Sequence, residues 1–580
     1  MKRLSWCTRA GLVFVAGACA SQAAAIEPYQ EYRKHIESAQ NLTALRDDLM
    51  GDSVSPYNGQ TEFVVTDISL PGNNALAVQL QRRFSIELDL VGDTVFNANI
   101  DGVGGWEVDV PNISGTFPTT GWSDNRCSGH MVPSHPAAFQ LTEIWQGNKV
   151  HIPGQGDRAM LGLNADSPRP DDGVARKWTT MQRDAIDCIP MQSGLAGEGF
   201  RLKTTEGVAY HFDVAASRLA GTLDRSMGQG GRARVGRVRR YLQASKVEDR
   251  FGNWVQYAYN ADGLPTRIWS SDGREIALAY AGGHLATATA NGRTWTYGYG
   301  AVEGKTRLTA VTRPDGSAWT YAYSNALSVQ TSTWDGNSRP DCAEQPLEAS
   351  AAMTMVVGHP SGASGTFNFR NLRHGRSGVH ASTCLQRVSN APGSTGVYYY
   401  ILSVPNFFDV VSLTDKTIAG PGLAAPLTWF YSYGNGFERL WGSPASPAVY
   451  PCTTCKQEKT VTVTNPDGTR TLHRYGSQYA LNEGRLLGTS ILDAAGREAS
   501  TRSSVYMTTA EVAAQAFAPT YGLIYGSDDP STAQVRPVVA EATDQDGVSY
   551  QISMLAFDGF ARPTRVNSSS ALGSRTDTIA

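Results

Sequence analysis

Apolar and aromatic residues recur at every second position in many short segments of the chain, and segments rich in glycine, proline and asparagine separate them. Two early examples are residues 61–67 and 76–88, which flank a turn segment at 71–74. A period of two places alternate side chains on one face of a β-strand. The pattern therefore predicts strands over most of the chain.

Between residues 246 and 325 this alternation becomes a repeat. Four glycines begin four consecutive units, and the third, fifth and seventh residues after each glycine are apolar or aromatic. The units are Gly252 with Val255, Tyr257 and Tyr259; Gly273 with Ile276, Leu278 and Tyr280; Gly292 with Trp295, Tyr297 and Tyr299; and Gly316 with Trp319, Tyr321 and Tyr323. Tyrosine at the seventh position four times in succession exceeds chance. A second short apolar segment follows each stripe, so each unit is predicted to be a two-stranded hairpin.

Weaker copies of the unit follow Gly207, Gly468 and Gly547, and residues 557–566 echo residues 259–268. A hairpin of two strands cannot bury its own apolar stripe, so neighbouring hairpins are expected to pair edge to edge and to continue one sheet. The predicted fold class is all-β: an array of hairpins that forms a spiralling, shell-like sheet.

The repeats suggest a division of the chain into six parts. These are a signal peptide at 1–25, a helical leader at 26–50, a smaller β-domain at 51–205, repeats at 206–329, an irregular β-insertion with cysteines at 330–460, and further repeats at 461–580. Within the last part, Thr508 and Glu511 have the spacing of a capping box, which predicts a short helix at 508–518.

Composition and charge narrow the functional classes. The chain has 580 residues, of which 41% are hydrophobic and 18% charged, which is globular composition. A formal net charge of -3 gives the chain no excess of positive charge, so no nucleic-acid partner is expected.

The first 25 residues combine basic residues, an apolar stretch and three alanines before Ile26, which predicts a Sec signal peptide and a secreted or cell-surface location. Lipidation at Cys19 is less favoured, and no transmembrane helix is expected in the mature chain.

Six cysteines remain after the expected cleavage, and an even number in an exported chain predicts disulfides. They are Cys127, Cys188, Cys342, Cys384, Cys452 and Cys455. Their pairing is open, except that Cys452 and Cys455 favour a local disulfide over a redox or zinc motif, because neither a βαβ pattern nor a second ligand pair accompanies them.

No catalytic, cofactor-binding or metal-binding residues are predicted. Gly300 to Thr306 resembles a phosphate loop with the wrong glycine spacing, and Asp544 to Gly547 resembles the start of a calcium loop without its closing ligands; both are expected to be turns. His130 and His135 near Cys127 lack a fourth ligand for structural zinc.

A hydrolase is also not favoured, since no Gly-x-Ser-x-Gly nucleophile elbow occurs. Pairs of carboxylates able to cleave a glycosidic bond cannot be chosen from 53 acidic residues by sequence. The rings of Trp295 and Trp319 suit either sheet packing or stacking on sugars, and packing is the favoured interpretation.

The unit at residues 249–260 resembles the tyrosine-aspartate repeats of the RHS (rearrangement hot spot) family, whose pattern is Asp-x-x-Gly-Arg followed by Tyr-x-Tyr-Asp. Residues 557–562 resemble a second unit, and residues 51–72 resemble the region that precedes the repeats in exported members. The resemblance implies a hollow shell of the kind found in bacterial RHS proteins, toxin-complex components and teneurins. Family shells commonly enclose a C-terminal toxin that is released by cleavage near the end of the shell.

The resulting hypothesis is an exported, non-enzymatic shell that encapsulates or presents a toxin or effector in competition between cells. No cleavage signature of the family precedes Ala580, so the cargo is expected to be encoded separately, or the protein to act at the surface without cargo. The expected partners are an encapsulated polypeptide toxin, a neighbouring shell segment or a cell-surface glycan. The alternative hypothesis is a cell-surface carbohydrate-binding or adhesive protein, and a secreted hydrolase is the least favoured.

Overall fold

The computed structural model describes residues 48–86, 102–327, 352–389 and 398–579, with short gaps at 120, 130–131, 140, 166, 168, 227–231, 326, 403 and 526–529. The expected signal peptide, Cys19, nearly all of the expected leader at 26–50, His130 and Cys342 lie outside this part. Residues 53–580 form one compact unit, which is described below. Its described helices are all too short or too polar to cross a membrane.

Strands dominate this unit, which confirms the predicted all-β class. The described α-helices are α3 (Leu141–Ile144), α4 (Ala381–Cys384) and α5 (Thr509–Ala513). The predicted capping box is present at the start of α5, where Thr508 and Glu511 bond reciprocally. This helix is shorter than the predicted 508–518, because Phe517 leaves the helical path to pack with Met507 and Val512.

Eight antiparallel strands form a closed ring near the start of the unit. They are β5 (Asn112–Pro118), β6 (Lys149–Ile152), β7 (Gly156–Gly162), β8 (Trp178–Thr180), β9 (Ala185–Pro190), β10 (Glu198–Lys203), β11 (Ala209–Ser226) and β12 (Arg232–Glu248). Each pairs with the next, and β12 pairs with β5 to close the ring. Buried aromatic rings meet inside it: Phe200 of β10 lies 6.4 Å from Trp178 of β8, and Phe117 of β5 stacks at 4.4 Å on Trp122 of the loop after β5.

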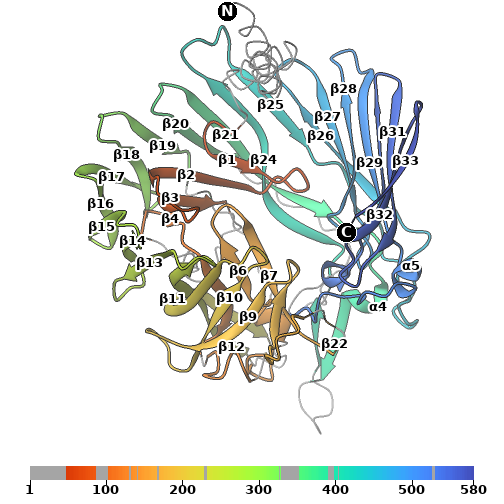
Figure 1. The fold of residues 1–580 in the computed structure, drawn as a ribbon, viewed down its shortest axis with the longest axis horizontal. Coiled ribbons are helices and arrows are strands. Elements are labelled where there is room, and N and C mark those ends of the chain that lie inside the picture. The colour runs from red at the N-terminus through yellow and green to blue at the C-terminus, as the bar shows by residue number, and fades with distance from the viewer. Residues whose placement is uncertain are drawn as a thin grey trace, which may run out of the picture. The chain divides into compact units, whose positions relative to one another are not determined.

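A long antiparallel sheet continues from β12 through successive hairpins (Figure 1). Its strands are β13 (Trp254–Tyr259), β14 (Pro265–Ser270), β15 (Glu275–Ala281), β16 (His284–Ala290), β17 (Arg293–Val302), β18 (Lys305–Thr312), β19 (Ala318–Tyr323), β20 (Met353–Gly358), β21 (Ser364–Gly375), β24 (Phe407–Ala419), β25 (Leu427–Ser432), β26 (Glu458–Thr464), β27 (Arg470–Gly476), β28 (Leu486–Leu492), β29 (Glu498–Tyr506), β30 (Val538–Gln545), β31 (Val548–Phe557), β32 (Pro563–Ser570) and β33 (Gly573–Thr578). The hairpins predicted for the units of Gly252, Gly273 and Gly292 are therefore present, in consecutive order. The strand of the Gly316 unit, β19, instead pairs with β20 at residues 353–358.

One edge of β12 is divided between two partners. Residues 237–243 pair with β5 of the ring, and residues 246–248 pair with β13 of the long sheet. The opposite edge pairs with β11 alone. The ring and the long sheet are thus joined through hydrogen bonds of a single strand.

The region expected to be irregular differs from the prediction. Strands β20, β21, β24 and β25 continue the sheet without a break, so the described part of 330–460 is largely regular up to residue 432. Their apolar residues alternate as in the other strands, as Met353, Met355 and Val357 show, but no glycine-tyrosine signature marks them. Strands β22 (Leu385–Ser389) and β23 (Tyr398–Leu402) form a separate hairpin. The other domain boundaries remain predictions.

Tyrosine at the last position of the stripe has a specific role in the repeats. The hydroxyl of Tyr259 donates to the carbonyl of Ala244 at 2.7 Å, and that of Tyr280 donates to Pro265 at 2.8 Å. Tyr299 and Tyr323 bond in the same way to Leu285 and Leu308, at 2.7 and 3.2 Å. Each acceptor lies on a strand of the preceding hairpin, so these tyrosines bind one repeat to the one before it.

A small sheet packs against the inner face of the long sheet, the face that carries the tyrosine stripe (Figure 1). Its strands are β1 (Asp52–Val54), β2 (Thr61–Leu70), β3 (Val78–Ser85) and β4 (Glu107–Val108). Trp106 lies 4.9 Å from Tyr321 of β19, and Phe63 lies 4.9 Å from Phe367 of β21, edge to face. These fully buried rings supply much of the contact between the two sheets.

A buried ion pair lies within the same contact. Arg82 Nε donates to Asp67 Oδ2 at 2.9 Å, and both side chains are 1% exposed. The guanidinium of Arg82 lies 4.6 Å from the ring centre of Trp106, and the hydroxyl of Tyr297 donates to Asp67 at 2.9 Å. The small sheet is therefore bound to the repeats by a buried polar contact as well as by packing.

Two disulfides are described completely. Cys127 bonds to Cys188, which connects the segment after β5 to β9, and Cys452 bonds to Cys455 as predicted. Cys384 is also in a disulfide, whose partner lies outside the described residues.

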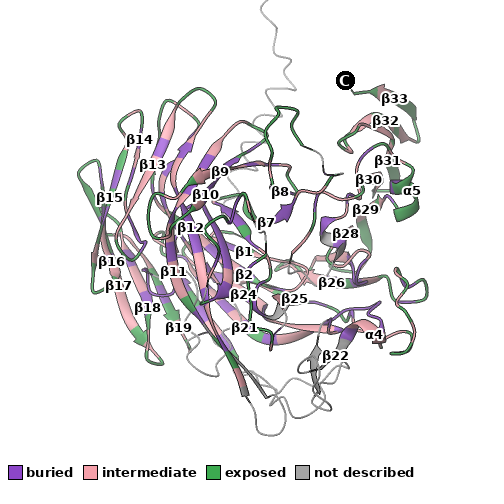
Figure 2. Cartoon of the chain, turned by 90° about the horizontal axis from the view of Figure 1, so that it is seen from below, coloured by how far each residue is buried: buried purple, intermediate pink, exposed green. Residues whose placement is uncertain are grey.

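Burial falls along the long sheet towards β33 (Figure 2). Tyr297 and Tyr321, in the strands that meet the small sheet, are 8% and 4% exposed. Tyr550 and Ile552 of β31 are 53% and 39% exposed. Stripe residues of the last strands therefore present apolar surface that the earlier strands bury.

Candidate functional site

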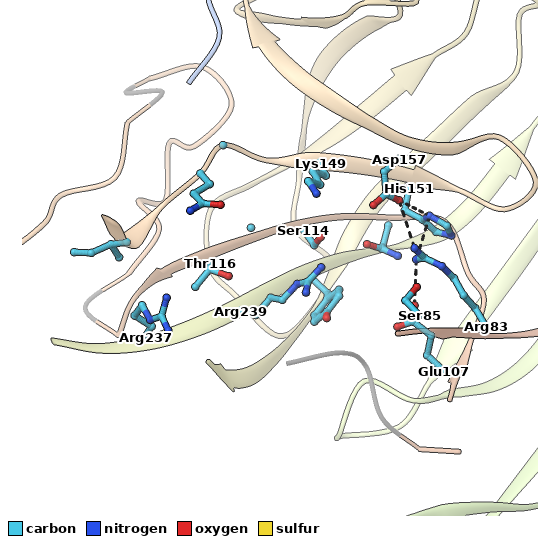
Figure 3. A pocket seen from close by; sticks show the side chains of 16 residues that line it. Arg83, Ser85, Glu107, Ser114, Thr116, Lys149, His151, Asp157, Arg237 and Arg239 are labelled. Atoms are coloured by element: carbon cyan, nitrogen blue, oxygen red, sulfur yellow. Dashed lines mark hydrogen bonds and ion pairs between the residues drawn. The ribbon is translucent and has the colours of Figure 1, made fainter. Parts of the chain in front are cut away.

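A cavity of about 380 Å³ lies beside the strand ring (Figure 3). Side chains alternate along β5: Ile113 and Phe117 point into the core of the ring, whereas Ser114 and Thr116 face the cavity. The cavity therefore lies on the outer side of the ring, between the ring and strands β3 and β4 of the small sheet. Its lining residues are Arg83, Ser85, Glu107, Asn112, Ser114, Gly115, Thr116, Ile144, Gln146, Gly147, Lys149, His151, Asp157, Arg237, Arg239 and Tyr241.

Strand register arranges these side chains in rows across the ring. Paired residues of antiparallel strands share a face, so partners in the register point to the same side. The first row contains Gln243, Asn112, His151 and Asp157; the second contains Tyr241, Ser114 and Lys149; the third contains Arg239 and Thr116; and Arg237 follows opposite Pro118.

His151 lies between two carboxylates at one end of the cavity. Its Nε2 is 2.6 Å from Asp109 Oδ1, and its Nδ1 is 2.8 Å from Asp157 Oδ1. Burial on its own would lower the pKa of His151, but the hydrogen bonds to both carboxylates outweigh burial and raise the pKa to about 9. The same imidazolium, against the opposing effect of burial, holds the pKa of Asp157 at about 2. His151 is therefore protonated at neutral pH.

Arg83 lies next to His151 and binds further carboxylates. Its guanidinium pairs with Glu62, lies 3.3 Å from Glu107 Oε1, and lies 4.0 Å from Asp157 Oδ1. Burial raises the pKa of Glu107 despite the nearby Arg83. Both cations at this end are thus matched by acidic groups.

The other end of the cavity is basic. Figure 3 shows Arg237 and Thr116 at the end away from His151, Arg239 between the two ends below Ser114, and Lys149 above Ser114. Arg237 donates to the carbonyl of Ala220 at 2.9 Å, and the guanidinium of Arg239 lies 5.3 Å from the ring centre of Tyr241. These contacts hold the two guanidinium groups in place.

Protonation of His151 is predicted to make stability fall as pH rises from about 6.5 to about 9. The pKa of His151 in the folded state lies above its unfolded value, so its stabilising contribution is complete below about pH 6.5 and is lost as pH rises through about 9. We expect a loss of up to about 3 kcal/mol over this range. Thermal unfolding at successive pH values, for the wild type and for His151→Gln, measures it.

The variant isolates the histidine from other titrating groups. His151→Gln should be much less stable than the wild type at pH 6, and the difference should shrink by pH 9.5. Parallel curves for the two proteins across this range would contradict the protonation of His151.

The motif-like segments singled out in the sequence are structural. The segment from Gly300 to Thr306 is a hairpin end, with the turn at Glu303 and Gly304 between β17 and β18. Asp546 and Gly547 form the turn between β30 and β31, as predicted. Trp295 is buried, and Trp319 packs edge to face on His359 at 4.6 Å. The two tryptophans are thus packed in the sheet.

The described residues around Cys127 are held by a disulfide and by hydrogen bonds. Cys127, Cys188 and Glu198 are the described cluster with ligand spacing, but the two sulfur atoms are joined in a disulfide and offer no thiolate. Glu198 instead accepts hydrogen bonds from the backbone of Cys127 and Ser128, at 3.0 and 2.8 Å. His135 is exposed.

Sequence reasoning did not find the charged cavity. Its residues come from six strands, one short helix and a loop between positions 83 and 241, so no local motif joins them. One signal was available: Arg237, Arg239 and Tyr241 alternate within a basic strand, which places two guanidinium groups on one face.

These features define an all-β protein in which a strand ring carries an extended sheet of hairpins. No protein-family model and no curated protein sequence matches the chain. A similar solved structure is described as the Tc holotoxin pore of Photorhabdus luminescens, with 10% sequence identity and a TM-score of 0.16 over 90% of this chain. This chain spans 26% of that neighbour's length.

Proposed function

We propose that this protein is an exported, non-enzymatic scaffold of the RHS type, whose long hairpin sheet holds a polypeptide effector against its inner face. Two observations support the proposal. The repeats resemble RHS units, and their hairpins pair consecutively into one sheet with the stripe on a single face. Sheet packing against a second polypeptide segment already occurs in this chain, where the small sheet covers β17 to β21.

The uncovered stripe of β31 is the observation that carries the proposal. Residues that pair directly across two strands, or that alternate along one strand, lie on the same face of the sheet. A series of such residues connects Tyr321 to Tyr550. The path runs from Tyr321 through Val357, Gly365, Ile418, Leu427, Tyr431, Val463, Thr471, Ile491, Ser500 and Gln545 to Val548 and Tyr550. Tyr550 therefore lies on the face that the small sheet covers elsewhere.

The exposed stripe has the chemistry of a protein-binding surface. Val548, Tyr550 and Ile552 alternate on this face and are each between 39% and 53% exposed, and Ile491 lies in the same row as Val548 at 45%. Contiguous exposed apolar surface of this kind marks interaction sites. A peptide segment that packs here would bury the stripe as the small sheet buries Tyr297 and Tyr321.

The test uses the full chain expressed together with the polypeptide encoded directly after residue 580, in the same or the next reading frame. Trypsin digestion should leave that polypeptide protected in the presence of the chain and cleaved without it. The double variant Tyr550→Glu/Ile552→Glu should lose the protection, because charged side chains on the inner face would have to be buried.

Val505→Glu is the matched control. Val505 is 55% exposed, and its pairing with Ala540 and then Ser553 places it on the opposite face of the sheet. This variant should protect as the wild type does. Equal protection by the inner-face variant, cleavage at the same rate with and without the chain, or a gene with no such frame would overturn the proposal.

A further inference from the structure

Strand β2 of the small sheet has one edge that is paired only in part. Its other edge pairs with β3 over residues 62–70. On the partly paired edge, β1 ends at Val54, and the N–H of Ser55 donates to the carbonyl of Gln60 at 2.9 Å, so β1 lies beside the first residues of β2. No further strand of the described chain pairs with this edge, which leaves residues 64–70 open over a length of about 23 Å.

The strand register shows which backbone groups face the open edge. Residues of antiparallel strands alternate between pairs that exchange both backbone hydrogen bonds and pairs that exchange none. The carbonyl of Gln81 accepts from the N–H of Asp109 at 2.8 Å, on the β4 side of β3, so its pair with Thr66 is of the second kind. The same holds for Ser69, which lies opposite Gln79. The N–H and C=O groups of Thr66 and Ser69 therefore face the open edge, and they have no backbone partner among the described residues.

The open edge lacks the usual protection against pairing. Free edges of sheets commonly carry lysine, other charged residues or proline, which oppose the addition of another strand. Residues 64–70 read Val-Val-Thr-Asp-Ile-Ser-Leu, in which Asp67 is the one charged residue. Asp67 forms a bulge, but its side chain is 1% exposed and bonds to Arg82, so its charge does not face the edge. An edge of this composition favours the pairing of a further strand.

Space for such a strand lies along β2. Two adjoining cavities, of about 160 and 350 Å³, follow residues 66–71 and share Asp67 and Arg313 in their lining. Trp295 and Trp319, which belong to the stripe on the inner face of the long sheet, line the two cavities as well. We call this space the β2 groove. Extended peptides bind such grooves through backbone hydrogen bonds to the edge and through alternate side chains in pockets.

We propose that an extended segment of the effector polypeptide pairs with the open edge of β2 and lies in the β2 groove, with its alternate apolar side chains against Trp295 and Trp319. The identity of this partner rests on the proposed scaffold function. The inner face of the long sheet lines the groove, and the proposed function assigns the same face to the effector. The groove and the exposed stripe of β31 thus become two contacts of one polypeptide.

Hydrogen–deuterium exchange of the full chain tests whether the edge is open. The amides of Thr66 and Ser69 should exchange quickly in the chain alone at every protein concentration, because no backbone acceptor holds them. Slow exchange in the isolated chain would show that a segment of its own covers the edge. Exchange that slows as the concentration rises would show that a second copy covers it. Either result would overturn the proposal.

Fluorescence anisotropy measures binding of a labelled probe, a six-residue peptide of alternating valine and threonine. The probe should bind saturably to the full chain and slow the exchange of Thr66 and Ser69. The same peptide with every backbone amide N-methylated should bind at least tenfold more weakly, because it has no N–H donors for the edge. Equal binding of the two peptides, or no saturable binding of the probe, would contradict strand addition.

Thr66→Pro removes the N–H that faces the groove and leaves the hydrogen bonds between β2 and β3 in place, so it should weaken binding of the probe at least tenfold. Thr66→Val is the matched control, because it changes the side chain and keeps the N–H, and it should bind as the wild type does. Circular dichroism compares the folding of the two variants, and the N-methylated peptide tests the same contact without any variant. Unchanged binding by a folded Thr66→Pro chain would count against the proposal.

Overlapping synthetic peptides from the polypeptide encoded directly after residue 580 identify the partner. At least one of them should displace the probe from the full chain. If none displaces it while the chain still protects that polypeptide from trypsin, this inference fails and the scaffold function stands. If the chain gives no protection, both fail.

Discussion

Replacing Asp67 with alanine is expected to destabilise the protein by about 3–5 kcal/mol, because the substitution leaves the guanidinium of Arg82 buried without its counter-ion. Both side chains are 1% exposed, so water cannot replace the lost carboxylate. The hydroxyl of Tyr297 would lose its acceptor at the same time. Urea unfolding followed by tryptophan fluorescence measures the change, since Trp106 lies next to Arg82.

Two further variants test the origin of this effect. Asp67→Leu/Arg82→Met removes both charges and should be more stable than Asp67→Ala, since burial of a lone charge is the costly event. Asp577→Ala removes an ion pair to Arg575, which is 80% exposed, and should leave the unfolding midpoint unchanged. A midpoint for Asp67→Ala equal to that of Asp577→Ala would contradict the structural role of the buried pair.

Replacing Trp106 with alanine is expected to cost about 3–5 kcal/mol, the range for a large ring removed from a packed core. Trp106 is fully buried and contacts both sheets: Phe84 of β3 at 5.3 Å and Tyr321 of β19 at 4.9 Å. Its loss should loosen the small sheet from the long one. Thermal unfolding measures the cost, and faster trypsin cleavage after Arg82 and Arg83 of β3 would report the loosening.

Phe430→Ala is the control for ring removal. Phe430 lies on β25 and is 56% exposed, so its truncation leaves no cavity and should shift the melting temperature little. A small shift for Trp106→Ala as well would show that the two sheets do not depend on this ring.

The hairpins could be predicted because the residues that specify each hairpin lie close together in the sequence. A glycine such as Gly252 ends the tight turn at residues 249–252 with φ 85°, a conformation that other residues rarely adopt, and the alternating stripe follows at once. The strands from β20 to β25 were missed for the same reason. They alternate as the others do, but no turn glycine with a tyrosine seven residues later identifies them.

The ring and its cavity could not be predicted, because they depend on distant pairings. Ring closure brings residues 112–118 beside 237–243, and only this register places Arg239 opposite Thr116. Likewise, His151 and Asp157 are ordinary strand residues until β6 and β7 pair and bring their side chains together. The alternation of Arg237 and Arg239 in β12 can be read from the sequence. The strand pairing that places them on the same face as Lys149 cannot.

The shared edge of β12 also constrains the order in which the newly made chain can assemble. Strand β5 is synthesised more than a hundred residues before its partner, so its backbone donors and acceptors must wait until residues 237–243 emerge. During that interval β5 presents an open edge, which is where misassembly and aggregation start. Strand β13 then becomes available to pair with the same edge of β12. Strand β5 pairs with seven residues of that edge and β13 with three, so the longer pairing favours β5.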